Sequence, residues 1–217
     1  MNDFASAREA MVDCQVRPSD VTRYPIIDAM LRVPREEYVP SNLRSVAYLG
    51  DHVPLGGNRV VLDPRVFGKM LDAINVGPKD LVLDIGCGYG YSAAVLSHMV
   101  EAVIALEEDP ELAEAAEEIL AAQGADNTVV ENGPLVEGKA QHGPFDAIII
   151  EGAIEELPDA IADQLKLGGR IIAIFVSGND GKAMLGLKTE NGIAWRRSFD
   201  ATAPLLPGFA ATKQFEF

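Results

Sequence analysis

The chain has 217 residues, of which 48% are hydrophobic, and this supply of apolar side chains suffices for the core of one domain. Its formal net charge of −15 argues against a protein that wraps nucleic acid, because such proteins present a basic surface to the phosphates. No apolar run approaches the length of a bilayer span, and the N-terminus lacks a basic-then-apolar secretion signal. Two cysteines, Cys14 and Cys87, are too few for a disulfide framework, so we expect a cytoplasmic protein.

The N-terminal part is expected to be helical first and irregular afterwards. Amphipathic spacing predicts one helix over residues 5–16 and a second over residues 24–31. Turn-forming residues dominate residues 47–64, which predicts a loop folded over the rest of the protein rather than a regular element. Asp63 and Pro64 then have the residue types of an N-cap and a first turn, and they predict the start of another helix.

Residues 81–90, LVLDIGCGYG, combine an apolar run of strand length with three glycines. A helix over residues 91–100 is expected to follow. This order of strand, glycine turn and helix is typical of a site for a nucleotide-like cofactor, because glycine lets the backbone approach the ligand closely. The glycine spacing is G-x-G-x-G, and Asp84 comes just before it. A carboxylate there suits a cationic amino-acid group better than a diphosphate, so the pattern favours S-adenosylmethionine over NAD.

A second strand is predicted over residues 102–106 and ends in Glu107. An acidic residue about 20 positions beyond a glycine turn can bind the ribose hydroxyls of such a cofactor. Asp109 and Pro110 follow as the cap and first turn of the next helix. The two carboxylates and the glycine turn together predict an adenosyl-binding site.

The rest of the chain alternates strands with helices before an antiparallel end. The elements predicted there are strands at residues 128–130, 144–150 and 170–176, and a helix from Ile154 to Leu167 that stops at Gly168-Gly169. Residues 185–199 are typical of a hairpin around Asn191-Gly192, and residues 213–217 alternate like one more strand. This order predicts an α/β fold with a doubly wound, mostly parallel sheet of about seven strands and an antiparallel C-terminal end.

Several short sequence runs spread over residues 22–180 match the pattern of one protein family. They are VPREEYVP at 33–40, AY at 47–48, PLG at 54–56, VLDIGCGYGY at 82–91, PFDAIII at 144–150 and QLKLGG at 164–169. With them the chain resembles the protein-L-isoaspartate (D-aspartate) O-methyltransferase family. The resemblance implies a Rossmann-like class I methyltransferase fold, in which residues 1–217 form a single domain and residues 1–62 are a helical and loop extension over the cofactor site.

The same resemblance implies S-adenosylmethionine as the cofactor and the stray carboxylate of an isoaspartyl peptide as the methyl acceptor. The cofactor contacts that it implies in this chain are Asp84, Gly86, Cys87, Gly88, Tyr91, Glu107, Pro134 and Leu135.

The chain departs from the family's pattern at three places. Leu62 replaces a serine whose hydroxyl lies beside the methyl group and the acceptor carboxylate. Pro134 and Leu135 replace the last two residues of a Gly-Asp-Gly run, so the adenine wall would be altered. Glu151 takes the place of a small polar residue at the end of the fourth strand. The candidate catalytic positions are therefore Leu62, Asp63 and Glu151.

These departures leave alternatives open. Asp63 either caps a helix or contacts the acceptor, and Glu151 either faces the acceptor or caps the next helix. Paired acids suit an amine or hydroxyl acceptor, so one alternative is a methyltransferase for a different peptide or small molecule. A second is a protein that binds the cofactor without catalysis. The glycine spacing disfavours a NAD-linked oxidoreductase, and three scattered histidines argue against a metal site.

Overall fold

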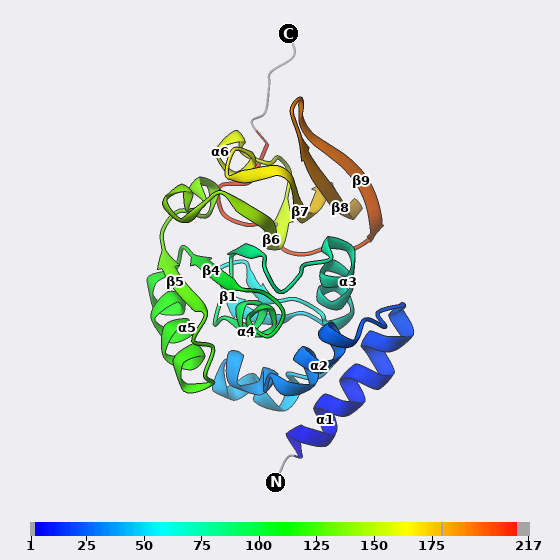
Figure 1. Ribbon diagram of the computed structural model, residues 1–217. Coiled ribbons are helices and arrows are strands. Elements are labelled where there is room, and N and C mark those ends of the chain that lie inside the picture. Colours follow the sequence, from blue (N-terminus) through cyan, green and yellow to red (C-terminus); the bar gives the residue numbers. More distant parts are fainter. Residues whose placement is uncertain (1–2, 179, 212–217) are drawn as a thin grey trace.

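The computed structural model describes residues 3–178 and 180–211, and a single seven-stranded sheet runs through its centre (Figure 1). Its strands are β3 (Leu81–Ile85), β4 (Ala102–Glu107), β5 (Thr128–Asn132), β6 (Phe145–Ile154), β7 (Leu165–Ser177), β8 (Asp180–Thr189) and β9 (Gly192–Asp200). The strand order is β5-β4-β3-β6-β7-β8-β9, with parallel pairing from β5 to β7 and antiparallel pairing of β8 and β9. The predicted fold class is confirmed.

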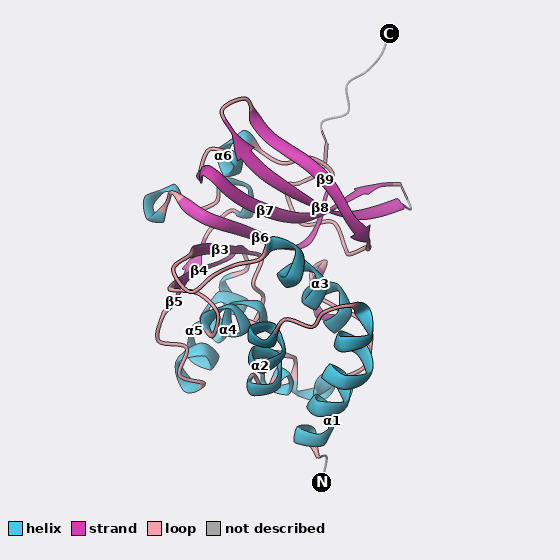
Figure 2. Ribbon diagram, turned by 45° about the vertical axis from the view of Figure 1, so that its right-hand side comes forward, coloured by secondary structure: helices cyan, strands magenta, loops and turns pink. Residues whose placement is uncertain are grey.

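Helices cover the two faces of this sheet unequally. They are α1 (Phe4–Met11), α2 (Tyr24–Arg32), α3 (Pro64–Ile74), α4 (Tyr91–Ser97), α5 (Pro110–Ala122) and α6 (Asp159–Ala162). Figure 2 shows α1 to α5 gathered on one side of the sheet and α6 on the other. The side chains of α1 to α5 belong to one large core, whereas the opposite core is closed by Leu135, Ile161, Leu206 and Phe209.

Shorter helical turns connect these elements. Residues Val12–Val16 continue α1 as a π-helical turn, and 3₁₀ turns lie at Arg17–Ser19, Arg35–Tyr38, Ser41–Val46, Leu135–Glu137 and Ala140–His142. The two predicted N-terminal helices are separated by a turn in which Asp20 adopts a left-handed conformation with φ 66°.

The predicted helix starts at α3 and α5 are confirmed. The Asp63 carboxylate accepts a hydrogen bond from the backbone N–H of Arg65, and Asp109 accepts bonds from the N–H groups of Glu111 and Leu112. Proline occupies the first turn of both helices, where the missing N–H costs nothing because it would have no intrahelical partner. These caps fix the residues at which the two helices begin.

The prediction that residues 47–64 contain no regular element is wrong. A short antiparallel hairpin, β1 (Val53–Gly56) and β2 (Arg59–Val61), lies in this segment. Gly57 and Asn58 at its turn have positive φ angles, as hairpin turns of this length require. Val53 and Val61 face each other and are buried in the core, so tertiary packing rather than the local sequence stabilises the hairpin.

The predicted helix from Ile154 to Leu167 is also wrong for most of its length. Strand β6 runs on to Ile154, and β7 already begins at Leu165. Only Asp159–Ala162 is helical, after Pro158 as its N-cap. Both ends of the segment are bound in β-pairing with the rest of the sheet, and this pairing overrides the helical spacing of the apolar residues. Gly168-Gly169 therefore lies inside β7 instead of ending a helix.

The C-terminal hairpin is confirmed, with β8 and β9 pairing antiparallel around Asn191-Gly192. The predicted strand at residues 213–217 lies outside the described residues.

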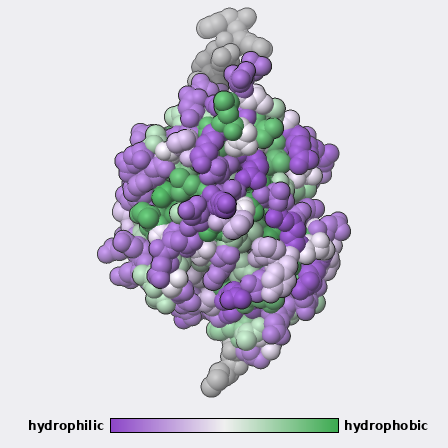
Figure 3. Space-filling view, in the orientation of Figure 1, coloured by the Kyte–Doolittle hydropathy of each residue, from purple (hydrophilic) through white to green (hydrophobic). Residues whose placement is uncertain are grey.

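Hydrophilic side chains dominate the face shown in Figure 3, with apolar side chains in small groups among them. Over residues 3–178 and 180–211, every helix is too short or too polar to cross a membrane.

The burial of the central sheet predicts which of its leucines contribute to the free energy of unfolding. Leu83 in β3 is 0% exposed, whereas Leu167 in β7 is 69% exposed. We expect Leu83→Ala to lower the free energy of unfolding by roughly 2–5 kcal/mol, through lost apolar burial and a cavity. The matched variant Leu167→Ala should change it by less than about 0.5 kcal/mol. Urea unfolding of both variants measures the difference, and equal losses would contradict this account of the core.

Candidate functional site

Three acidic side chains come together near the carboxyl ends of neighbouring strands. Asp84 in β3 and Glu107 at the end of β4 are 0% exposed, and Glu151 in β6 is 5% exposed. Strand β3 pairs in parallel with both β4 and β6, so the carboxyl ends of the three strands share one edge of the sheet. Open α/β sheets bind their ligands at this edge. The predicted cofactor acids and one predicted acceptor-side acid thus belong to one site.

The glycine turn after β3 is hydrogen-bonded to the carboxyl end of β4. The backbone N–H groups of Gly86 and Cys87 donate to the carbonyl oxygen of Leu106, and the N–H of Gly88 donates to Glu107 at 2.8 Å. Gly86 and Gly88 have φ angles of 84° and 57°, which side chains larger than hydrogen rarely adopt. The turn therefore ties the ends of β3 and β4 together.

The hairpin β1–β2 packs directly against this turn. A Cβ atom at Gly86 would lie 2.8 Å from Nη2 of Arg59, and one at Gly88 would lie 2.5 Å from Cδ1 of Leu55. The two glycines thus leave room for side chains of the hairpin, which occupy the space beside the turn in this structure.

Arg59 is a site residue that the sequence analysis missed. Its Nη2 atom lies 2.6 Å from Oε2 of Glu107, and its Nε donates to Oε1 at 3.3 Å. The two side chains are 5% and 0% exposed, so this is a buried ion pair. The only signal in the sequence was one basic residue inside a segment expected to cover the site. Its carboxylate partner lies 48 positions further along the chain.

Asp84 has an unusual environment for a carboxylate. The hydroxyl of Ser92 donates to its Oδ2 at 2.6 Å, while Oδ1 is buried and has no hydrogen-bond partner among the described residues. Burial raises the pKa of Asp84 to about 7, and the nearby Glu107 adds to this, although Ser92 and Arg59 act in the opposite direction. A free, buried carboxylate oxygen of this kind can accept a hydrogen bond from a cationic ligand group.

Glu151 lies where the pairing of β6 with β7 changes register, between Ile149 and Ala153. Such a bulge redirects a side chain relative to the regular strand. Burial and the charge of Asp84 raise the pKa of Glu151 well above its usual range, against the effect of Arg59 and Arg35. Its Oε1 atom is buried without a partner in the described part of the chain. The alternative that Glu151 caps the next helix is wrong, because Pro158 holds the N-cap position of α6.

The other two candidate catalytic residues have structural contacts in this structure. Leu62 is 1% exposed in the core, and its carbonyl oxygen accepts a bond from Arg35 at 2.8 Å. Asp63 caps α3 and also pairs with the Arg65 guanidinium at 2.9 Å. Burial would raise the pKa of Asp63, but the hydrogen bonds from Arg65 prevail and lower it. Of the two interpretations offered for Asp63, the structure shows the helix cap.

Two predicted cofactor contacts face inward from the glycine turn. Cys87 is buried, and burial raises the pKa of its thiol well above the usual range, so it favours the neutral form. Tyr91 points toward the N-terminal part of the chain, where the Arg35 guanidinium lies 4.7 Å from the centre of its ring. The rings of Tyr38 and Phe67 pack around it at centroid distances of 5.9 and 5.7 Å. Tyr91 therefore joins the N-terminal part to the site.

The remaining two predicted contacts follow β5. Asn132 pairs with Glu107 across the parallel strands, and the N–H of Gly133 donates to the Glu107 carbonyl at 3.1 Å. Pro134 is exposed next to this position, but the Leu135 side chain is fully buried in the opposite core. The structure thus places Pro134 at the edge of the site and directs Leu135 away from it.

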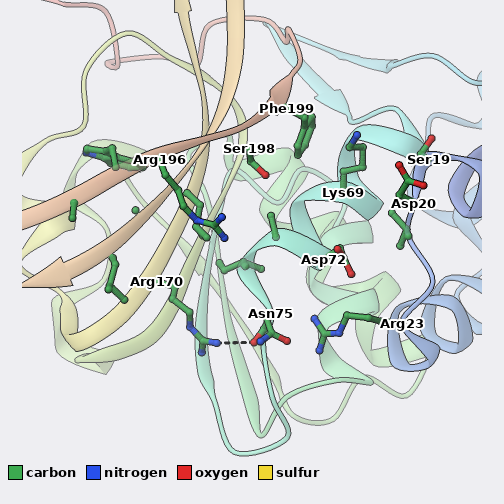
Figure 4. A pocket seen from close by; sticks show the side chains of 18 residues that line it. Ser19, Asp20, Arg23, Lys69, Asp72, Asn75, Arg170, Arg196, Ser198 and Phe199 are labelled. Atoms are coloured by element: carbon green, nitrogen blue, oxygen red, sulfur yellow. Dashed lines mark hydrogen bonds between the residues drawn. The ribbon is translucent and has the colours of Figure 1, made fainter.

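A separate cavity of about 920 Å³ lies between α3 and the strands β8 and β9 (Figure 4). Its lining includes Lys69, whose ammonium group lies 4.9 Å from the centre of the Phe199 ring, and Arg170, which donates to the Asn75 carbonyl. The predicted site residues are absent from its lining. This cavity is therefore distinct from the site at the sheet edge.

The sheet order, the glycine turn and the acids that end β3 and β4 define the architecture of a class I methyltransferase. A family model described as protein-L-isoaspartate(D-aspartate) O-methyltransferase matches residues 6–198. The chain belongs to this family, as its resemblance in sequence indicated.

Individual relatives agree with this assignment. A protein-L-isoaspartate O-methyltransferase of Roseiflexus sp. strain RS-1 is 36% identical over 214 residues, which cover 98% of this chain and 97% of the relative. One from Gloeobacter violaceus is 36% identical over 190 residues, covering 87% and 93% of the two chains.

Two solved structures share the fold. A protein-L-isoaspartate O-methyltransferase superposes with a TM-score of 0.81 at 23% identity, covering 93% of this chain and 66% of the other. A putative protein-L-isoaspartate O-methyltransferase from Plasmodium falciparum, in complex with S-adenosyl-L-homocysteine, superposes with a TM-score of 0.78 at 22% identity. That superposition covers 95% of this chain and 99% of the other.

The raised pKa of Asp84 predicts how the stability depends on pH. Between the ordinary carboxyl value of 3.8 and about 7, the folded protein retains a proton that the unfolded chain has lost. The contribution of Asp84 to the free energy of unfolding therefore falls as the pH rises through this interval, and it is constant above it. We expect Asp84→Asn to gain stability relative to the wild type as the pH rises from about 5 to about 7. Urea unfolding at stepped pH measures this, and a constant difference would contradict it.

Proposed function

We propose that this protein transfers a methyl group from S-adenosylmethionine to the stray carboxylate of isoaspartyl residues in peptides and proteins. The observation that carries the proposal is the buried pair of acids on neighbouring strands, Asp84 and Glu107, on either side of a glycine turn in a chain of this family. The relatives named above support the acceptor.

The residues present fit the cofactor. The free Oδ1 atom of Asp84 is buried and can accept a hydrogen bond from the α-ammonium group. Glu107 lies at the end of the next strand, and its carboxylate can bind the ribose hydroxyls when the two bonds from Arg59 are released. Gly86 and Gly88 add no Cβ atom to the turn, so a ligand that approaches it displaces only the side-chain ends of Arg59 and Leu55. Pro134 follows Gly133, whose N–H is bonded to Glu107, and would form part of an adenine wall.

The reaction demands alignment more than proton transfer. S-adenosylmethionine supplies a methyl group on a positively charged sulfur, and an acceptor oxygen forms its bond to this carbon as the bond to sulfur breaks. A carboxylate acceptor is already ionised near neutral pH and requires no general base. The protein's task is to hold the acceptor in line and to stabilise its charge. Leu62 cannot donate a hydrogen bond for this purpose, and its buried side chain offers only an apolar wall.

The N-terminal residues 1–62 are part of the proposal as a cover over the cofactor site. Arg35 and Tyr38 pack against Tyr91 in the first turn of α4, and the hairpin β1–β2 packs against the glycine turn. We also propose a reducing, cytoplasmic setting, which is supported by the free thiols of Cys14 and Cys87 in the described ranges.

Calorimetric titration with S-adenosylhomocysteine tests the cofactor site, and transfer of labelled methyl to an isoaspartyl peptide in the same preparation tests the acceptor. We expect saturable binding and methyl transfer. Binding without transfer would reject isoaspartate as the acceptor and would favour a different acceptor or a non-catalytic binding protein. Failure to bind would reject the cofactor site itself.

The same titration tests whether Asp84 binds the ammonium group of the ligand. Asp84→Asn should weaken binding of S-adenosylhomocysteine by about tenfold or more, because a charge-assisted hydrogen bond is lost. The wild type should bind more tightly at pH 8 than at pH 6, since the ligand's ammonium group favours the ionised form of a carboxyl whose pKa is raised to about 7. Asp28→Asn, at a surface pair with Arg32, is the matched control and should bind like the wild type. Binding that weakens with rising pH would refute this role.

A further inference from the structure

Arg59 holds the carboxylate that the cofactor's ribose requires. Glu107 accepts five hydrogen bonds, from Nε and Nη2 of Arg59 and from the N–H groups of Gly88, Glu108 and Asp109. Both of its oxygens are engaged, and Arg59 contacts each of them. The five bonds already exceed the roughly four lone-pair sites of a carboxylate, so Glu107 cannot accept two further bonds from ribose hydroxyls unless the two from Arg59 are released. Arg59 must release Glu107 before a ribose can bind there.

The backbone of the hairpin restricts where Arg59 can go. Val53 and Val61 at its base are buried and face each other, and the next carbonyl, that of Leu62, is held by Arg35. The exposed part of the hairpin is its turn, at residues 56–58. Side chains alternate along a strand, so Arg59 points to the same buried side as Val61. A guanidinium that leaves Glu107 by rotation of its side chain therefore starts from the buried side of the hairpin, next to the site.

An acceptor carboxylate at this edge would lie among acidic groups, which favours a cation beside it. Asp84, Glu107 and Glu151 already place three acidic groups at this edge, and an acceptor carboxylate would be a fourth. Like charges buried together are strongly unfavourable unless a cation lies among them. Arg35 is fully buried, but its Nε and Nη2 are committed to the carbonyls of Ala47 and Leu62. Arg59 is the cation whose partner is a carboxylate of the site, and its Nη1 atom, like that of Arg35, is buried without a hydrogen-bond partner among residues 3–178 and 180–211.

We propose that Arg59 determines the acceptor specificity: it pairs with Glu107 in the empty protein and with the acceptor carboxylate once the cofactor is bound. This inference rests on the proposed function. It assigns to a guanidinium the donor role that Leu62 cannot fill, and it favours an anionic acceptor over an amine, which Arg59 would repel. It also orders the binding steps, because Arg59 becomes available to the acceptor only after the cofactor has bound.

Arg59→Ala and Arg59→Lys test the proposal against Arg17→Ala, which removes a half-exposed arginine paired with Asp13 on the surface. Thermal unfolding first establishes that each variant is folded. Calorimetry then gives the dissociation constant for S-adenosylhomocysteine, and steady-state methyl transfer gives KM and kcat for an isoaspartyl peptide. The lysine variant keeps the charge but loses the forked geometry of the guanidinium.

We expect Arg59→Ala to bind S-adenosylhomocysteine at least as tightly as the wild type, because the competing ion pair is gone. The same variant should raise KM for the isoaspartyl peptide by about tenfold or more, with an intermediate rise for Arg59→Lys. Arg17→Ala should match the wild type in both measurements.

Two results would overturn the proposal. Binding of S-adenosylhomocysteine weakened about tenfold in Arg59→Ala would make Arg59 a ligand of the cofactor instead of its competitor. An unchanged KM for the peptide would remove its role toward the acceptor. A wild type that binds no S-adenosylhomocysteine is a different failure, since it would reject the proposed function and this inference together.

Discussion

The ion pair between Arg59 and Glu107 is the interaction on which the site depends. Parallel pairing of β3 with β4 and β6 brings three acidic side chains to one buried edge of the sheet. Moving a single charge out of water costs several kcal/mol, and like charges add to that cost. A guanidinium among these acids reduces the cost by pairing with one of them, and burial leaves the other two with raised pKa values. The hairpin β1–β2, the glycine turn and the carboxyl ends of the strands are thus parts of one electrostatic unit.

This unit connects the N-terminal part of the chain to the chemistry. Leu55 and Arg59 reach the glycine turn from the hairpin, and Arg35 stacks on Tyr91 at the start of the next helix. Arg35 also donates a hydrogen bond to the carbonyl of Leu62, and this bond holds the segment between the hairpin and α3 in place. The hairpin β1–β2 and the acidic edge of the sheet are therefore in direct contact through Arg59.

Much of the central sheet could be predicted because its signals are local. The apolar run before Asp84, the glycines after it and the caps at Asp63 and Asp109 act over a few residues, and all of them form as expected. Predictions failed where long-range pairing decides the conformation. The hairpin exists because Val53 and Val61 are buried by the core, and the segment from Ile154 to Leu167 became mostly strand because both its ends pair with the sheet.

The sequence by itself determined the fold class and the family, since strand periodicity, glycine turns and helix caps depend on neighbouring residues, and it singled out Asp84 and Glu107 as candidate cofactor ligands. It could not show that Asp63 is held by Arg65 as a cap, that Leu135 turns into the opposite core, or that Arg59 pairs with Glu107. Those facts depend on which side chains meet after folding. Only the tertiary structure brings a cation and an acid 48 positions apart to within 2.6 Å. Once both side chains are buried, water is excluded and they pair with each other.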